Sequence, residues 1–165
     1  MKLALATDHV GYEALKELKL FLESLGHQCI DFGPKQLIKD DDYPDYIRPA
    51  ALSVASGESQ MGVILGGSGQ GEAIVANRVP GIRCAVFYGT AVARQPIDAA
   101  GHGSRDPYEI IKLSRQHNDA NMLSLAGRFL SFPEMKHAVK LWLETDFSGD
   151  PRHMRRINKI DGGLS

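Results

Sequence analysis

Short apolar runs alternate with longer amphipathic stretches along this chain of 165 residues. Apolar runs of strand length lie at residues 3–7, 27–32, 61–65, 82–87 and 122–126. Between them apolar residues recur at helical spacing, as at Leu15, Leu18 and Leu22. This spacing, with end signals at Gly26, at Ser131 with Glu134 and at Asp150, predicts helices over 13–25, 43–56, 71–78, 108–116 and 133–143, and a last helix that begins at Asp150-Pro151.

Strands that alternate with helices predict an α/β domain, with a mostly parallel, five-stranded sheet covered by helices on both faces. We find no internal repeat and no second domain, so we expect one domain over residues 1–165. The least regular stretch, Gly89–Asp106, is expected to be a loop with some helix inside it. Ligands bind at the carboxyl ends of the strands in such sheets. Asp8-His9, the glycine turn at 66–71 and the Tyr88 loop all follow strands, so they can line one crevice.

Composition narrows the class of protein. Hydrophobic residues make up 43% and charged residues 24%, with a formal net charge of -1, which argues against disorder and against a large basic surface for nucleic acid. The first apolar run is too short for a signal peptide, and no run reaches the roughly 20 residues of a transmembrane helix. Cys29 and Cys84 stand singly in apolar stretches, as reduced core residues do. We therefore expect a cytoplasmic protein without nucleic-acid or membrane partners.

The glycine turn Gly66-Gly67-Ser68-Gly69-Gln70-Gly71 is the first chemical candidate. Four glycines in six residues let several backbone N–H groups approach a ligand oxygen, and a following helix makes the place an anion site. The turn lacks the Lys-Ser/Thr ending of a nucleotide-binding P-loop, and no acidic ribose partner lies at the expected distance. The alternative is a tight strand–helix connection without a ligand.

Glu72 follows this turn on the first helical turn. The helix dipole also stabilises a carboxylate at that place, and this is the purely structural explanation for Glu72. The functional interpretation is that Glu72 removes a proton next to a carbonyl while the loop amides hold the developing enolate oxygen. An isomerase needs that pairing of a base with oxyanion donors.

Three other groups are weaker candidates when taken alone. Asp8-His9 is equally well explained as a loop with a helix cap, and His117-Asn118-Asp119 as a capped turn. Arg152 and Arg156 are four residues apart on the last helix, where they could grip one phosphate or simply face solvent. No grouping of His, Cys, Asp or Glu has convincing metal spacing, so no metal is expected.

Taken together, these motifs resemble a known family. Ala6–Gly11, Asp42–Pro44, Gly66–Arg78, Val79–Arg83, Ser114–Asp119, Gly127-Arg128 and Arg152–Arg156 occur in the order and context of type B ribose 5-phosphate isomerases. That family also includes galactose 6-phosphate and allose 6-phosphate isomerases. The resemblance covers nearly the whole chain.

The resemblance implies a Rossmann-like, three-layer α/β/α fold with a protruding C-terminal helix. It implies a reaction without cofactor or metal, and a homodimer, which could pair further into a tetramer, whose active sites are shared between subunits. Glu72 would be the base, and Asp8 and His117 would open the sugar ring. The expected substrate-binding residues are His9, Tyr43, Gly67, Ser68, Gly69, Gly71, Asn77, Asn118, Arg128, Arg152 and Arg156. Of these, His9 and the three arginines would bind phosphate, and the Gly67–Gly71 amides would stabilise a cis-enediolate. His117, Asn118 and Arg128 would come from the partner subunit.

Two departures from the family pattern matter. Many members place a cysteine base where this chain has Gly66, and this sequence instead follows a branch with a glutamate at the position of Glu72. Roughly fifteen residues at about 88–103 have no counterpart in the compact members, and such a loop can reshape a sugar pocket.

Ribose 5-phosphate and ribulose 5-phosphate are the expected substrate pair. The alternatives are a six-carbon phosphosugar, such as allose 6-phosphate or galactose 6-phosphate, and a phosphosugar-binding subunit without catalysis.

Overall fold

The computed structural model describes residues 1–162, so the last three residues of the expected domain lie outside it. Its centre is a five-stranded sheet with the strand order β2-β1-β3-β5-β4, in which every neighbouring pair is parallel. The strands are β1 (Lys2–Thr7), β2 (Gln28–Asp31), β3 (Met61–Gly66), β4 (Cys84–Phe87) and β5 (Met122–Ala126). The predicted parallel sheet is confirmed.

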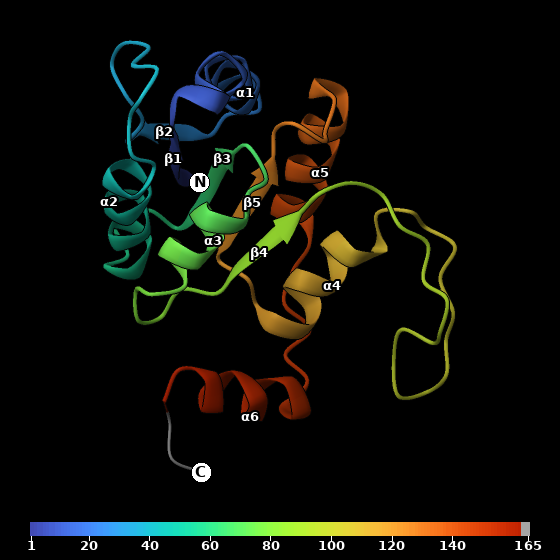
Figure 1. Ribbon diagram of the computed structural model, residues 1–165. Coiled ribbons are helices and arrows are strands. Elements are labelled where there is room, and N and C mark those ends of the chain that lie inside the picture. The colour runs from blue at the N-terminus through green and yellow to red at the C-terminus, as the bar shows by residue number, and fades with distance from the viewer. Residues whose placement is uncertain (163–165) are drawn as a thin grey trace.

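Helices cover both faces of the sheet (Figure 1). On one face α1 (Tyr12–Ser24), α4 (Glu109–Asn118) and α5 (Phe132–Glu144) pack against the side of β1 that carries Leu3 and Leu5. On the other, α2 (Pro44–Ala55) and α3 (Gln70–Ala76) pack against the side that carries Ala4 and Ala6. Alternate residues of a strand point to opposite faces, so each strand supplies both cores. The three-layer α/β/α arrangement is confirmed.

Predicted and observed helix ends differ by one or two residues, and the capping signals act as expected. Gly26 takes a left-handed φ of 85° just after α1. Ser131 and Glu134 form the capping box at the start of α5. The Asp150 carboxylate accepts a hydrogen bond from the Arg152 N–H at 2.7 Å, which starts α6 (Pro151–Ile160).

The strand order determines where the crevice lies. The chain passes from β1 outward to β2 and then back to β3 on the other side of β1, so the direction of winding reverses between β1 and β3. At such a reversal the loops beyond the strands' carboxyl ends separate and leave a crevice. The 3-10 turn η1 (His9–Gly11) after β1 and the glycine turn after β3 both lie at this place.

Two segments project from the body (Figure 1). Helix α6 lies apart from the sheet and is tied back by the Arg83–Asp161 ion pair at 2.8 Å. Residues 89–106 form an irregular loop that contains no helix, so the expectation of helix within it is wrong. Its base is fastened by a hydrogen bond from the Ala91 N–H to the Pro107 carbonyl and by one from Ser104 to Glu109. No helix within residues 1–162 has the length and apolar character needed to cross a membrane.

Candidate active site

The glycine turn is held in place by its neighbours on β5. The Ser124 hydroxyl, fully buried, donates a hydrogen bond to the Gly69 carbonyl at 2.7 Å. The N–H groups of Gly127 and Arg128 donate to the carbonyls of Gly66 and Gly67 at 2.8 and 3.0 Å. Gly69 has a left-handed φ of 73°, which an L side chain would strain.

Three carbonyls of the turn are hydrogen-bonded within the protein, but two of its N–H groups can still bind a ligand oxygen. Among residues 1–162, no protein oxygen accepts a hydrogen bond from the N–H of Gly67 or Ser68. Both amides lie just before α3, where the helix dipole also favours negative charge. The turn can therefore hold an oxyanion, as its sequence predicts.

The Glu72 side chain folds back over Gly66. A Cβ atom at Gly66 would lie 1.9 Å from Oε1 and 2.0 Å from Cδ of Glu72, so the carboxylate occupies the volume that any side chain at Gly66 would need. The position of the Glu72 carboxylate therefore depends on the absence of a side chain at residue 66. The chain could not carry a side chain at residue 66 and keep the Glu72 carboxylate where it is.

The environment of Glu72 suits a base. The residue is 5% exposed, and burial raises the pKa of its carboxyl above the ordinary value. A backbone hydrogen bond opposes this rise, the buried Asp8 carboxylate adds to it, and the Arg128 guanidinium lowers the pKa again. A carboxylate whose pKa lies nearer the working pH takes and returns a proton more readily.

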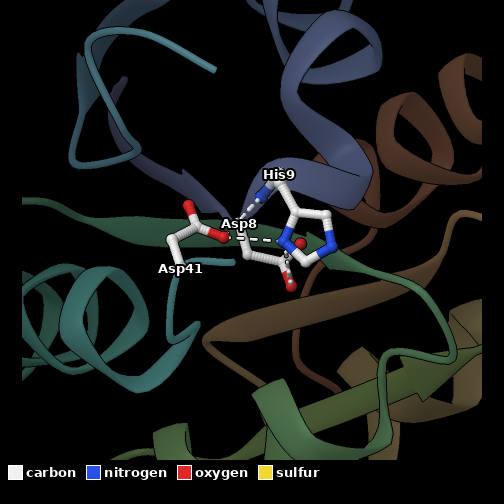
Figure 2. Close-up of side chains that lie close together, drawn as sticks. All are labelled: Asp8, His9 and Asp41. Carbon is white, nitrogen blue, oxygen red and sulfur yellow. Dashed lines mark hydrogen bonds and ion pairs between the residues drawn. The ribbon is translucent and has the colours of Figure 1, made fainter. Parts of the chain in front are cut away.

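Asp8, His9 and Asp41 form a cluster at the end of β1 (Figure 2). Asp8 Oδ1 accepts a hydrogen bond from the Val10 N–H, as a cap of η1. His9 Nδ1 lies 2.7 Å from Asp41 Oδ1 and 3.8 Å from Asp8 Oδ2. The ligand atoms lie within 4.8 Å of one another, a grouping that could hold a metal ion and that the sequence did not reveal. The 2.7 Å separation is, however, that of a hydrogen bond, which needs a proton on Nδ1 and not a metal.

Tyr43 and Arg128 complete this side of the crevice. A Cβ atom at Gly71 would lie 2.6 Å from the Tyr43 hydroxyl, so the phenol packs directly on the turn. The Arg128 guanidinium likewise lies against Gly67, with Cζ 3.2 Å from a Cβ built there. Arg128 therefore reaches the turn of its own chain, and the expectation that a partner subunit supplies it is wrong, because β5 ends beside β3.

A second group of expected site residues lies elsewhere. His117 and Asn118 at the end of α4 line a cavity of about 340 Å³ together with His153 and Arg156 of α6. The rings of His117 and His153 stack at 4.2 Å with a tilt of 16°. Arg152 lies 3.3 Å from His153 Nε2. Burial first, and then the positive charges of His117 and Arg152, lower the pKa of His153.

The two groups lie at opposite ends of the sheet. Helix α4 runs back along the sheet and ends just before β5 begins, so His117 and Asn118 lie at the amino end of the strands. Glu72 lies beyond the carboxyl end of β3. The five residues of β5 rise about 3.3 Å each, so on the order of 15 Å separates the groups. One chain does not bring Glu72 and His117 to the same substrate atom.

Asn77 lies away from Glu72 and lines a second cavity, of about 370 Å³, together with Asn118, and its expected role in substrate binding stays a prediction. Its side-chain oxygen accepts from the Cys84 N–H at 2.8 Å, and its side-chain nitrogen donates to the Cys84 carbonyl at 3.0 Å. Cys84 is the first residue of β4, so Asn77 lies at the amino end of the sheet. Both of its polar groups fasten α3 to this edge strand.

Asp41, Ser124 and His153 are site residues to which sequence reasoning gave no role. Asp41 is one of three consecutive aspartates, and nothing local distinguishes it from Asp40 and Asp42. Ser124 lies inside an apolar run, where a lone hydroxyl is the only signal of a buried hydrogen bond. His153 lies between Arg152 and Arg156 of the last helix, but its stacking on His117 depends on contact between α4 and α6, which the sequence does not indicate.

Comparison with known proteins identifies the family. The family model described as Ribose/Galactose Isomerase matches residues 3–100 and 105–160. The ribose-5-phosphate isomerase B of Mycolicibacterium paratuberculosis is 35% identical over 158 residues, covering 96% of this chain and 88% of that protein. The ribose-5-phosphate isomerase B structure from Clostridium thermocellum superposes with a TM-score of 0.83 at 35% identity, covering 98% and 95% of the two chains. A second similar structure is the ribose-5-phosphate isomerase B of Mycoplasma genitalium with bound ribulose-5-phosphate (29% identity, TM-score 0.82, covering 97% and 94%). The chain belongs to the ribose/galactose isomerase family.

Proposed function

We propose that this protein interconverts ribose 5-phosphate and ribulose 5-phosphate, with Glu72 as the base. The observation that carries the base assignment is the contact between the Glu72 carboxylate and Gly66, beside the free amides of Gly67 and Ser68. The relatives named ribose-5-phosphate isomerase B support this substrate pair. We place the enzyme in the cytoplasm, in keeping with its two free thiols and its phosphosugar substrate.

The reaction follows from the chemistry of the site. Glu72 removes the proton from C2 of the open-chain aldose, and negative charge moves onto the C1 carbonyl oxygen. The Gly67 and Ser68 amides hold the oxygens of the resulting cis-enediolate. Glu72 then returns the proton to C1, and the hydroxyl proton on O2 passes to O1, which leaves the ketone at C2. His9 and Arg128 hold the phosphate from the same side of the crevice.

We further propose that two copies of the chain build each active site. His117, Asn118, Arg152 and Arg156 have the chemistry for ring opening and for holding hydroxyls and phosphate, but they lie at the far end of the sheet from Glu72. A second copy that offers this end to the crevice would complete the site. Asp8 of one copy and His117 of the other would then share the ring-opening step. Mixing Glu72→Gln with His117→Ala protein should restore part of the activity that each lacks, because mixed dimers contain one intact site.

A substrate panel tests the proposed function. Purified protein is assayed with ribose 5-phosphate, allose 6-phosphate and galactose 6-phosphate, with Glu72→Gln as the matched inactive control. We expect turnover of ribose 5-phosphate with the highest kcat/KM. Preference for a six-carbon substrate would contradict the substrate assignment. Binding of a phosphosugar without turnover would contradict the enzyme assignment and favour a binding subunit.

A further inference from the structure

Asp41 lies in the crevice but has no task in the proposed reaction. Its side chain is 4% exposed, whereas the neighbouring Asp40 and Asp42 are exposed. A buried carboxylate is costly unless its charge is matched by hydrogen bonds or an opposite charge. The groups that hydrogen-bond to the Asp41 carboxylate therefore indicate which residue Asp41 positions.

Both of its hydrogen bonds from His9 end on the same oxygen. Asp41 Oδ1 accepts from the His9 backbone N–H at 3.1 Å and faces the ring nitrogen Nδ1 at 2.7 Å. The main chain and the ring of His9 are therefore held by one atom. Figure 2 shows the other ring nitrogen, Nε2, on the side of the ring that faces away from Asp41. His9 remains 34% exposed, so Nε2 is accessible to a ligand.

This contact sets the proton pattern of the imidazole. A carboxylate oxygen accepts only, so Nδ1 must carry the proton of the 2.7 Å bond. A neutral ring with its proton on Nδ1 presents a lone pair at Nε2, which repels a phosphate oxygen. Only the imidazolium presents an N–H there. A ring held in this orientation can therefore donate to a phosphate from Nε2 as the imidazolium, whose Nδ1–H remains bonded to the Asp41 carboxylate.

The other groups around the ring are compatible with this arrangement. Asp8 Oδ2 lies 3.8 Å from Nδ1 and adds negative charge. Tyr46 of α2 also acts to lower the pKa of Asp41, and within residues 1–162 the second carboxylate oxygen, Oδ2, is buried without a hydrogen-bond partner. Burial alone would raise the pKa of Asp41, but the hydrogen bonds and charge of His9, together with Tyr46, outweigh burial and leave that pKa below its ordinary value. Asp41 is therefore ionised at neutral pH.

We propose that Asp41 is the positioning residue of His9, which it orients and keeps as a hydrogen-bond donor to the substrate phosphate. This inference rests on the proposed function, in which His9 binds phosphate. A rival explanation is that Asp41 only fastens the loop at residues 34–43 to the end of β1. The two explanations differ in whether the effect of Asp41 passes through His9.

A double-mutant cycle separates them. The variants are Asp41→Asn, His9→Ala and the double variant, with Asp40→Asn as the matched control at an exposed neighbour. Each is measured for kcat, for KM with ribose 5-phosphate, and for competitive inhibition by inorganic phosphate. Asparagine keeps an acceptor for the ring and removes the charge. Hydrogen bonds to charged groups contribute enough for roughly a tenfold to hundredfold change in binding.

We expect Asp41→Asn to raise KM and the phosphate inhibition constant by that factor with little change in kcat, and to have no further effect once His9 is alanine. Asp40→Asn should match wild type. Additive effects in the cycle, or wild-type phosphate inhibition in Asp41→Asn, would overturn the role of Asp41 alone. If His9→Ala itself left phosphate inhibition unchanged, the phosphate role of His9 would fail and the inference with it.

A spectroscopic measurement on the wild-type protein makes the test independent of whether the variants fold. The ¹⁵N shifts of the His9 ring distinguish a proton on Nδ1 from one on Nε2. We expect Nδ1 to stay protonated across the whole titration. A neutral form with its proton on Nε2 would overturn the proposal.

Discussion

Gly66→Ala is the substitution that most sharply tests the coupling between residue 66 and the base. The added Cβ would lie 1.9 Å from Glu72 Oε1, and its three nearest atoms all belong to the Glu72 carboxylate. Ordinary contact begins at 3.4 Å, so the carboxylate must move by about 1.5 Å. Gly66 lies at the end of a strand and is not among the glycines with positive φ, so alanine suits its backbone.

The expected result is a loss of rate with little loss of stability. A misplacement of about 1 Å can cost about 10²-fold, and complete loss of a positioned base costs about 10²–10⁴-fold. We therefore expect kcat to fall by about 10²–10⁴-fold, which corresponds to about 3–5 kcal/mol in the barrier. Steady-state kinetics with ribose 5-phosphate and thermal unfolding measure the two effects. KM should change little, since the three atoms nearest the added Cβ belong to Glu72 and not to a phosphate-binding side chain.

Two comparisons make this result interpretable. Gly103→Ala, where an added Cβ meets nothing within 4 Å, should leave the rate unchanged. In the Glu72→Gln background, Gly66→Ala should cause almost no further loss, because the group that it displaces has already lost its function. Wild-type kcat in Gly66→Ala, or an equal fall of kcat in both backgrounds, would contradict the coupling between residue 66 and Glu72.

Three further predictions concern the second group of residues and the glycine turn. In His117→Ala, the aldose-to-ketose rate should stop rising with enzyme concentration, because spontaneous ring opening becomes limiting. The initial rate from ribulose 5-phosphate, which is acyclic, should stay proportional to enzyme concentration. Proportionality in both directions would contradict a ring-opening role of His117. Because the pKa of His153 is lowered in the folded protein, the unfolded chain binds a proton first as the pH falls below about 6.5. The free energy of unfolding therefore decreases between that pH and the folded-state pKa. His153→Phe should make this decrease smaller in chemical unfolding experiments run from about pH 7.5 to 5. Ser124→Ala removes a buried hydrogen bond to Gly69 and should cost about 1 kcal/mol in the free energy of unfolding and lower kcat, whereas unchanged values of both would show that the bond does not hold the turn.

The fold was predictable from the sequence because each buried strand and each amphipathic helix leaves its own period in the pattern. The capping signals at Gly26, Ser131 and Asp150 placed helix ends to within one or two residues. The loop at residues 89–106 was less predictable, since its glycines and Pro96 break every period without indicating the path of the backbone. Whether it is an insertion that shapes the sugar pocket stays a prediction.

The site was predictable in its parts but not in its assembly. The glycine turn and Glu72 are adjacent in sequence, so their chemistry could be inferred locally, although the fit of the carboxylate over Gly66 could not. Asp41 reaches His9 across 32 residues, and Arg128 reaches Gly67 through the β3–β5 pairing. The separation of His117 from Glu72 depends on the direction in which α4 runs along the sheet. These relations are properties of the packed chain and leave no periodic signal.

Solvent deuterium incorporation shows whether Glu72 is the group that moves the proton between C1 and C2. Wild-type protein and Glu72→Gln are incubated with ribose 5-phosphate in D₂O, and deuterium at C1 of ribulose 5-phosphate and C2 of the aldose is followed by NMR. We expect incorporation by the wild type. We expect Glu72→Gln to lose both incorporation and turnover by at least about 10²-fold while inorganic phosphate still binds. Glu72→Gln protein that exchanged deuterium and turned over at near wild-type rates would contradict the assignment of Glu72 as the base.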